Sequence, residues 1–391
     1  MNRESVQEYA ERQRERYQKA SKKEKSRIID EVVAVTGYHR KATIRLLCGH
    51  KRSQAGGTRG RPVLYGPQVA QAARIVHEAT GGVGAKRLQP FVPEMAARLE
   101  TFGELEVDPE TGLLLRQASA STLERLLAPY QVPTRKRPRS LTKPGTLVKN
   151  RVPIRTFTEW DDARPGFLEV DTVAHCGHTV EGFYICTVAA VDIATAWVEM
   201  TPVWGKTQTR VGAGINRIRR MLPVPLLGLD SDNGVEFINR QLIAYCQERG
   251  ITFTRSRPYR KNDSAHIEQK NGAVVRRLAG HSRYWTSDAM QQLVTVYSLA
   301  RLHVNFFQPV RRLSAKTREG ARVVRYHDEA KTPYQRMVES GALSETRHMM
   351  LEKLYRSLNP LQLSRQIELE TERLLRMAWR PGDPLTWSPT R

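Results

Sequence analysis

Three acidic residues in the second half of the chain are spaced and flanked as catalytic acids would be. Asp171 follows the strand-like segment GFLEV, Asp232 stands in the sequence SDNG, and Glu268 lies in SAHIEQKN with 35 residues between it and Asp232. Carboxylates that converge on one point repel one another unless a cation compensates them. Oxygen ligands suit Mg²⁺ or Mn²⁺, and two such ions can activate the attacking oxygen and stabilise the leaving oxygen of a phosphoryl displacement. The acids therefore indicate metal-dependent phosphoryl transfer.

A mixed five-stranded sheet is the element that must position these acids. Residues 159 to 285 read as βββαβαβα. One strand ends near Asp171, and FYICTVAAVDIATAWVEMTPV supplies two more strands around a turn. LLGLD and ITFTRS are the fourth and fifth strands, flanked by helical segments, and the helix that carries Glu268 closes the unit. We expect the acids to lie at the ends of elements of this one sheet.

Asp230 is a competing candidate for the second acid, because it lies only two residues before Asp232. A single Asp after a strand is most often a turn or cap residue. The SDNG sequence and the 35-residue spacing to Glu268 both favour Asp232.

The segments LEVDTVAH, DSDNGVEF and RPYRKNDSAHIEQKN resemble the three signature blocks of the retroviral-integrase-like DDE core, which is found in bacterial insertion-sequence transposases, phage Mu-type transposases and retroviral integrases. The resemblance implies an RNase H-like fold and two divalent ions, Mg²⁺ or Mn²⁺, in each active site. It implies Asp171, Asp232 and Glu268 as the catalytic, metal-binding triad. It also implies that Lys270 and Asn271 are polar residues of the catalytic helix that face DNA.

The charge balance independently indicates a polyanionic partner. The 391 residues include 63 Lys and Arg against 40 Asp and Glu, a net charge of +23 with a pI near 10.2, which is typical of nucleic-acid binding. No stretch has the length and apolarity of a membrane span, and the charged N-terminal segment is unlike a secretory signal. Four widely spaced cysteines without a CxxC pair argue against a disulfide framework or a structural zinc site. We expect a cytoplasmic, nucleoid-associated protein.

Composition, together with the resemblance to DDE cores, divides the chain into six parts. They are a helix-turn-helix DNA-binding domain (1–52), a Gly/Arg-rich linker (53–66), a second helical or helix-turn-helix DNA-binding domain (67–132), a basic linker (133–158), the RNase H-like catalytic core (159–285), and a mostly helical, basic C-terminal region (286–391). In the first part a Gly turn at Gly37 precedes a basic helix, the layout of a helix-turn-helix, although an ordinary helical hairpin is the alternative. In the third part, Ser119 or Ser121 caps a second candidate recognition helix.

Basic residues in these parts are the candidate DNA contacts. Arg59-Gly60-Arg61-Pro62 is similar to an AT-hook core, with a plain tether as the alternative, and residues 134 to 155 contain eight Lys or Arg and no acid. The candidates are Arg40, Lys41, Arg59, Arg61, Arg135, Lys136, Arg137, Arg139, Arg255, Arg257, Arg260, Lys261, Lys270, Asn271, Arg276 and Arg277.

Together these features predict a DNA transposase that binds transposon terminal repeats and target DNA as at least a dimer. The sequence identifies no ATPase helper protein. An RNase H-type metal-dependent nuclease and a domesticated DNA-binding regulator are the alternatives. The segment His175-Cys176-Gly177-His178 offers ligands for a soft metal, but two His and one Cys on a short loop more often pack or touch substrate.

Overall fold

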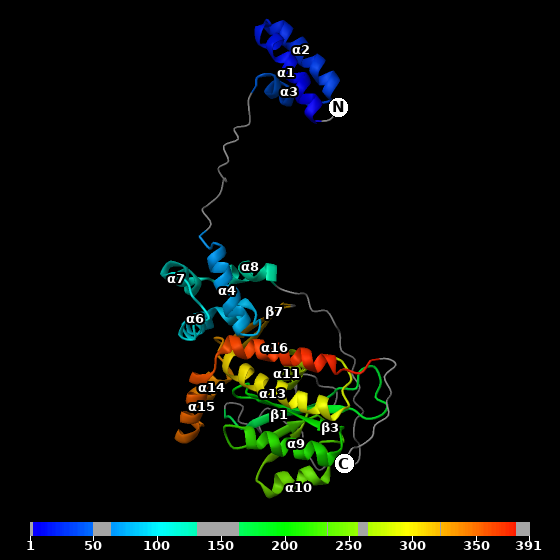
Figure 1. Cartoon of the computed structure of the whole chain (residues 1–391), viewed down its shortest axis with the longest axis vertical. Coiled ribbons are helices and arrows are strands. Elements are labelled where there is room, and N and C mark those ends of the chain that lie inside the picture. Colours follow the sequence, from blue (N-terminus) through cyan, green and yellow to red (C-terminus); the bar gives the residue numbers. More distant parts are fainter. Residues whose placement is uncertain are drawn as a thin grey trace. The chain divides into compact units, whose positions relative to one another are not determined.

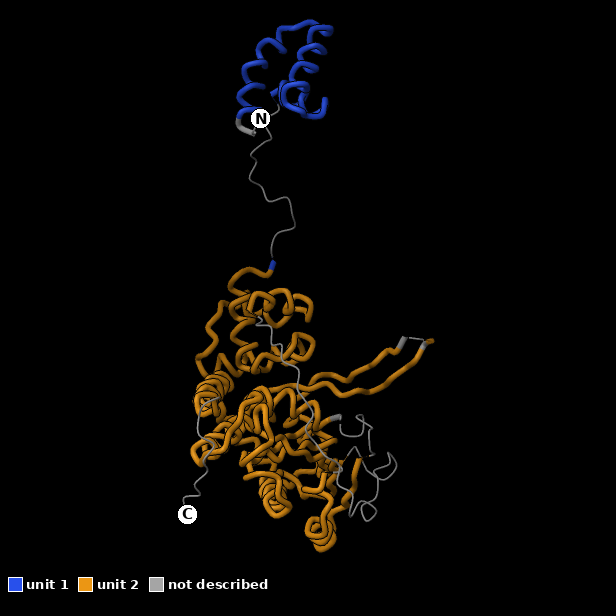
Figure 2. Tube along the Cα trace, turned by 90° about the vertical axis from the view of Figure 1, so that its right-hand side faces the viewer, with its two compact units in different colours: residues 1–64 blue, residues 65–391 orange. Residues whose placement is uncertain are grey.

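The computed structural model describes residues 3 to 49, 64 to 130, 164 to 232, 234 to 256, 265 to 320 and 322 to 380. The chain forms two compact units, residues 1 to 64 and residues 65 to 391 (Figure 2).

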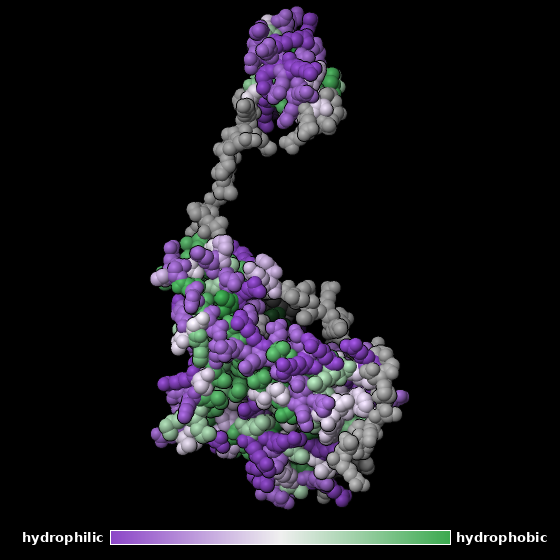
Figure 3. Space-filling view, viewed as in Figure 1, coloured by the Kyte–Doolittle hydropathy of each residue, from purple (hydrophilic) through white to green (hydrophobic). Residues whose placement is uncertain are grey.

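The N-terminal unit is a bundle of three helices, α1 (Arg3–Lys19), α2 (Lys22–Thr36) and α3 (Arg40–Leu47). Ser21 and Glu24 form a capping box at the start of α2, and Gly37 ends it with a left-handed φ of 72°. Tyr17, Ile28, Ile29, Val32 and Leu47 form its core, while hydrophilic residues cover most of its visible face (Figure 3). The predicted order of helix, Gly turn and basic helix is present.

The second unit begins with a helical module. Its elements are α4 (Pro67–Ala79), α5 (Ala85–Leu88), α6 (Val92–Thr101), α7 (Pro109–Gln117) and α8 (Ala120–Leu127), with short 3-10 turns at Gln89–Phe91 and Ala128–Tyr130. Ser119, rather than Ser121, caps α8 by accepting a hydrogen bond from the amide of Thr122.

A mixed five-stranded sheet follows, in the strand order β3-β2-β1-β4-β5. Its strands and intervening helices are β1 (Phe167–Ala174), β2 (Ile185–Asp192), β3 (Val198–Trp204), α9 (Gln208–Met221), β4 (Gly228–Ser231), α10 (Arg240–Glu248) and β5 (Thr252–Arg255). Strands β1, β2 and β3 are antiparallel, whereas β1, β4 and β5 are parallel. The predicted βββαβαβα order is confirmed, and the sheet with its flanking helices fits an RNase H-like core.

Helices cover both faces of the sheet (Figure 1). Val211 and Ile215 of α9 pack with Leu168 and Val170 of β1 on one face. On the other face lie α11 (Ala265–Lys270), a π-helical segment (Asn271–Val275), α12 (Arg276–Ala279) and α13 (Ser287–Phe307). Alternation along β1 turns Glu169 and Asp171 toward α11, so the helix that carries Glu268 covers the face where Asp171 points.

The C-terminal region closes the unit with α14 (Pro333–Glu339), α15 (Glu345–Ser357) and α16 (Pro360–Arg376). These helices also hold the helical module, because the guanidinium of Arg98 lies 3.7 Å from the ring centroid of Tyr355 and donates to its carbonyl at 2.7 Å. His303 of α13 bonds the carbonyl of Ala79 at 2.8 Å. The module, the sheet and the C-terminal helices therefore share one compact unit.

A free-standing β-ribbon interrupts the predicted helical C-terminal region. Among the described strands, β6 (Leu313–Glu319) and β7 (Arg322–His327) pair only with each other, and they project from the unit (Figure 2). These strands were not predicted in the basic stretch around residues 311 to 325, because charged residues on both faces leave no regular apolar alternation along the segment. No helix in the described part of the chain has the length and apolarity to cross a membrane.

Candidate active site

Helix α11 is fastened to strand β1 on both sides of Glu268. The amide of Ile267 donates to Glu169 Oε2 at 3.0 Å, and Asn271 Nδ2 donates to Asp171 Oδ2 at 2.7 Å. Because these contacts come from the residue before Glu268 and from the next helical turn, they fix where α11 presents Glu268. The Glu268 side chain itself is exposed.

Asp171 and Asp232 stand at corresponding levels of neighbouring parallel strands. Val170 of β1 pairs with Ser231 of β4, so each acid is the residue after a paired position. The predicted end of the first strand near Asp171 is wrong, because β2 continues to pair with β1 as far as Ala174. Strand β4, in contrast, ends at Ser231, so the carboxyl groups of Asp171 and Asp232 lie at the same level, where β4 ends.

The two carboxyl groups repel each other. Asp171 is half-buried, and its burial, followed by the charge of Asp232, raises its pKa from 3.8 to about 7. Glu236 raises this pKa further, whereas the ammonium group of Lys206 lowers it. The surroundings of Asp171 therefore do not carry enough positive charge to stabilise its ionised form.

Asp230, the competing candidate for the second acid, is buried inside the sheet. It is 1% exposed within β4, and its Oδ1 accepts a hydrogen bond from Thr254 Oγ1 of β5 at 2.6 Å. Asp232 is half-buried beyond the strand, and its Oδ1 accepts from the amide of Gly234 at 2.9 Å. Asp232 therefore lies beyond the end of β4, whereas Asp230 lies within the strand.

Glu236 is a fourth acid near Asp171 and was not among the predicted site residues. Its buried carboxylate accepts from Thr172 Oγ1 at 3.0 Å and pairs with Lys206 Nζ at 3.4 Å. A Cβ on Gly234 would lie 2.6 Å from Glu236 Oε2 and 2.9 Å from Asp232 Oδ1. Gly234 therefore lets the chain pass between two carboxylates. The signal was present in the sequence, since Glu236 lies inside the DSDNGVEF block.

The donor set fits a hard divalent cation that also binds substrate. Among the described residues, no group of three or more His, Cys, Asp or Glu side chains is placed to hold a metal ion by itself. Asn271 Oδ1, however, is buried and receives no hydrogen bond from the described part of the chain, beside the carboxylate of Asp171. Mg²⁺ is commonly bound by one or two carboxylates together with substrate phosphates, which suits Asp171 and Asp232.

The predicted DNA contacts in the core differ in exposure. Arg277 is exposed, but Arg255 and Lys270 are only 8% and 9% exposed and do not form an open surface. Lys270 is two residues after Glu268, about 200° around the helix, and so points away from the acids. Arg276 donates to the carbonyls of Ala174 and Gly280 at 3.1 and 3.3 Å.

The remaining predicted contacts lie in the N-terminal unit or outside the described residues. Arg40 pairs with Asp30 and bonds Ser26 Oγ at 2.8 Å within its own bundle, whereas the Lys41 side chain is exposed. Outside the described residues lie Arg59, Arg61, Arg135, Lys136, Arg137, Arg139, Arg257, Arg260 and Lys261.

In the segment after β1 that offered soft-metal ligands, His175 and Cys176 pack into the core, whereas His178 is exposed. His175 is buried, its Nε2 lies 2.7 Å from Thr187 Oγ1, and its ring meets that of Tyr284 edge-on. Burial lowers the pKa of His175 to about 3, so its ring is neutral at physiological pH.

Solved structures similar to this chain include retroviral integrases. They are the catalytic core domain of BIV integrase (20% identity, 45% of this chain and 95% of that chain, TM-score 0.28), the HTLV-2 integrase catalytic core domain (15%, 37% and 90%, 0.28) and the simian T-cell lymphotropic virus intasome (16%, 61% and 73%, 0.31).

No protein-family model matches the chain. Over 314 residues, which are 80% of this chain and 89% of its relative, it is 43% identical to the uncharacterized protein y4rM of Sinorhizobium fredii. The chain therefore belongs to the same family as y4rM.

Proposed function

We propose that this protein is a DNA transposase that nicks the 3′ ends of a DNA element and joins them to target DNA by metal-dependent phosphoryl transfer. The observation that carries the proposal is the placement of Asp171 and Asp232 at one edge of adjacent parallel strands, with the Glu268 helix bound across them through Asn271. The three sequence blocks that resemble DDE cores supply these same residues. Two DNA ends must be joined together, so the active form is at least a dimer.

In this proposal each side chain has a defined task. Asp171 and Asp232 would hold the divalent cation, and Glu268 would complete the set from α11. When bound there, the cation would supply activation of the attacking oxygen and charge stabilisation at the leaving oxygen. Asn271 fixes the Asp171 carboxylate by its 2.7 Å hydrogen bond. Catalysis is then mainly positioning and charge neutralisation, as is general for phosphoryl transfer.

Reaction of the full-length protein with DNA tests this function. Duplexes made from the sequences that flank the gene are incubated with Mg²⁺, Mn²⁺ or EDTA, and products are separated on denaturing gels. We expect 3′-end nicking and strand-transfer products that depend on the metal. Cleavage without any strand transfer from a pre-nicked end indicates a nuclease of RNase H type. Binding without either reaction indicates a DNA-binding regulator.

The β6–β7 ribbon supports DNA as the partner. Lys316 and Arg325 are directly opposite each other in the ladder, and Arg318 lies two residues from Lys316 on the same face; all three are exposed. Like charges directly opposite are destabilising, and a two-stranded ribbon alone is marginal in water. A polyanion compensates this repulsion, and a two-stranded ribbon fits the major groove of B-DNA.

Removing these three charges should weaken DNA binding. For the triple substitution of Lys316, Arg318 and Arg325 by Gln, we expect the slope of log affinity against log salt to fall by up to about 3, because each phosphate contact contributes close to one unit. Fluorescence anisotropy with a duplex at several salt concentrations measures the slope. An unchanged slope excludes the ribbon from the DNA interface.

Glu236 should affect the activity through the groups that it contacts. Glu236→Gln weakens the contact with Lys206 and removes one negative charge beside Asp171, so we expect metal-dependent nicking to fall about 10- to 100-fold, the usual range for outer partners of metal ligands. The metal concentration that gives half-maximal nicking should rise as well. A variant with wild-type rates and metal dependence leaves Glu236 a purely structural residue.

A further inference from the structure

A lysine side chain reaches the candidate active site from the turn after β3. The ammonium group of Lys206 lies 3.4 Å from Glu236 Oε1, and the same oxygen accepts a hydrogen bond from Thr172 Oγ1 at 3.0 Å. The amide of Thr172 in turn donates to Asp171 Oδ1 at 2.7 Å. A short series of contacts therefore joins Lys206 to the first acid of the site.

The second acid faces the other oxygen of Glu236. A Cβ on Gly234 would be 2.6 Å from Glu236 Oε2 and 2.9 Å from Asp232 Oδ1, so these two oxygens lie next to the same point. Glu236 thus presents one oxygen to Lys206 and the other toward Asp232. Through this one carboxylate the lysine is placed near both acids.

The backbone around Lys206 is held on both sides. Strand β3 ends at Trp204, and Gly205 follows with a left-handed φ of 63°, while its amide donates to the carbonyl of Tyr184 at 3.0 Å. The side chain of Arg210, in α9, donates to the carbonyl of Trp204 at 2.9 Å. These contacts fix the position from which the Lys206 side chain extends.

The contact with Glu236 does not use the full capacity of the ammonium group. An ammonium group carries three donors, and within the described part of the chain Lys206 Nζ has one polar contact, at 3.4 Å. Charge-assisted N–H···O bonds are usually about 2.7–2.9 Å long, so this contact is long for a structural ion pair. The Lys206 side chain is 26% exposed, whereas that of Glu236 is 6% exposed. The lysine therefore has donors, and access, for a further acceptor.

We infer that Lys206 binds the DNA phosphate that enters the site of these acids. Asp171, Asp232 and Glu236 place three carboxylates there, and a phosphodiester adds another negative charge. A cation in contact with one of its oxygens reduces the resulting repulsion. Lys206 supplies this cation from a turn that carries none of the acids. The inference rests on the proposed function for the identity of the substrate as DNA.

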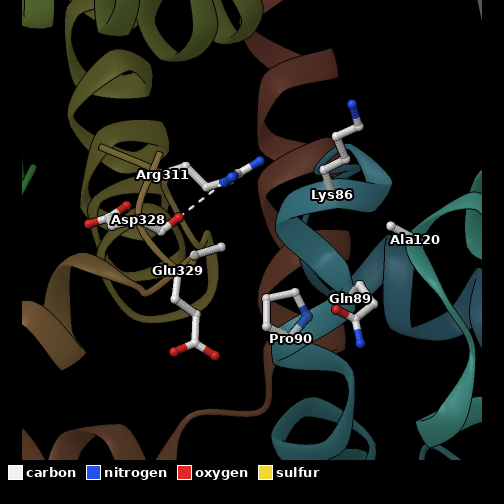
Figure 4. A pocket seen from close by; sticks show the side chains of 8 residues that line it. Lys86, Gln89, Pro90, Ala120, Arg311, Asp328 and Glu329 are labelled. Carbon is white, nitrogen blue, oxygen red and sulfur yellow. Dashed lines mark hydrogen bonds between the residues drawn. The ribbon is translucent and has the colours of Figure 1, made fainter. Parts of the chain in front are cut away.

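A cleft elsewhere in the second unit does not have this role. Its volume is about 340 Å³, and Lys86 of α5 and Arg311 lie on opposite walls of it, together with Asp328 and Glu329 (Figure 4). Arg311 already donates to the carbonyls of Asp328 and His327 at 3.1 and 3.5 Å. None of the candidate catalytic acids lines this cleft, so a phosphate bound there is not one on which they act.

Substitution of Lys206 tests the inference through DNA binding alone. Lys206→Gln keeps a hydrogen-bond donor for Glu236 but removes the charge, and Lys353→Gln makes the same change at an exposed position on α15. Each is made in the full-length Asp171→Asn chain, in which one repelling carboxylate is absent. Binding to duplexes from the sequences that flank the gene is measured by anisotropy over a range of salt in EDTA. We expect the slope of log affinity against log salt to fall by about 1 for Lys206→Gln, the value for one lost phosphate contact, and to stay unchanged for Lys353→Gln.

Glu236→Gln in the same background separates contact with DNA from an effect through Glu236. It keeps an oxygen next to Lys206 and removes no cation, so its slope should not fall. An equal fall for Lys206→Gln and Glu236→Gln shows that Lys206 acts only by holding Glu236 and overturns the inference, as do equal slopes for Lys206→Gln and Lys353→Gln. If Lys206→Gln does not fold, the double variant with Glu236→Gln, which leaves no buried unpaired charge, replaces it and should show the same fall.

A neutral methylphosphonate at the nicked position identifies the phosphate. In the chain that retains Lys206 it should lower the salt slope by about 1, because the charge that Lys206 contacts is gone. In Lys206→Gln the same duplex should leave the slope unchanged. An equal effect in both chains places the lysine at another phosphate and overturns the inference.

Nicking by chains with all acids present gives an independent readout. Lys206→Gln should lower kcat/KM about 10- to 100-fold, the usual effect of losing a hydrogen bond to a charged group, whereas Lys206→Arg should restore most of the activity. Binding that depends on Lys206 in a protein that does not nick DNA keeps this inference and removes the proposed transposase function. Nicking by a protein whose binding and kcat/KM do not depend on Lys206 keeps the function and removes the inference.

Discussion

Asp171→Asn and Asp232→Asn are each expected to lower metal-dependent nicking and strand transfer by about a thousandfold or more. A metal ion supplies several kcal/mol of charge stabilisation in the transition state, and every 1.36 kcal/mol corresponds to a factor of ten. Asparagine keeps the shape of the side chain but removes its charge. DNA affinity measured without metal should stay close to that of the wild type. Gel assays of product formation and anisotropy on the same preparations measure the two quantities.

Two further variants make this result specific. Glu268→Gln should lose activity in the same way, since Glu268 lies on the helix that Asn271 fastens to Asp171. Asp230→Asn is the matched control, because Asp230 bonds Thr254 inside the sheet rather than facing the site; its folded fraction should keep nicking activity. Full activity in Asp171→Asn would falsify the metal-site assignment, and loss of activity in a well-folded Asp230→Asn would transfer the second role to Asp230.

Asp171→Asn should also stabilise the metal-free protein at neutral and alkaline pH. The pKa of Asp171 is about 7 in the folded chain against an ordinary value of 3.8. Between these values the folded state retains a proton that the unfolded state has lost, so wild-type stability falls as pH rises from about 4 to 7. The substitution removes this penalty, which is fully present above pH 7. At pH 4 the two proteins should be alike.

Thermal unfolding in EDTA at pH 4, 6 and 8 measures this effect. At pH 8 we expect Tm to rise by a few degrees, since each kcal/mol shifts Tm by about 2–4 °C in domains of 150–250 residues. Mg²⁺ should raise the wild-type Tm at pH 8 more than that of the variant, because it compensates the same charge. Asp288→Asn, at the exposed start of α13, is the control and should show no such gain. A lower Tm for Asp171→Asn at pH 8 would contradict an uncompensated carboxylate.

Asp171→Asn is thus expected to lower the activity and to raise the stability, which is the usual relation between stability and activity at a charged site. The repulsion between Asp171 and Asp232 costs stability in the metal-free protein and creates the affinity for a cation. A fold that removed the repulsion internally would also remove the reason for a metal to bind.

The features that the sequence determined by itself are those set by local patterns. The strand alternation, the helical periods and the chain breaks between them were enough to predict the βββαβαβα order that the sheet confirms. The capping box of Ser21 and Glu24 and the left-handed Gly37 depend on neighbouring residues only. The common level of Asp171 and Asp232, in contrast, depends on the pairing of Val170 with Ser231 between β1 and β4.

Only the tertiary structure decided the contacts between distant parts of the chain. Glu236 joins the site because Thr172 and Lys206 reach it from other elements, and the helical module is held where Arg98 meets Tyr355 of α15. The paired strands β6 and β7 depend on a ladder between charged segments that carry no apolar alternation. Spacing along the chain fixes which side chains share an element, but burial and electrostatic interaction between elements fix which of them meet.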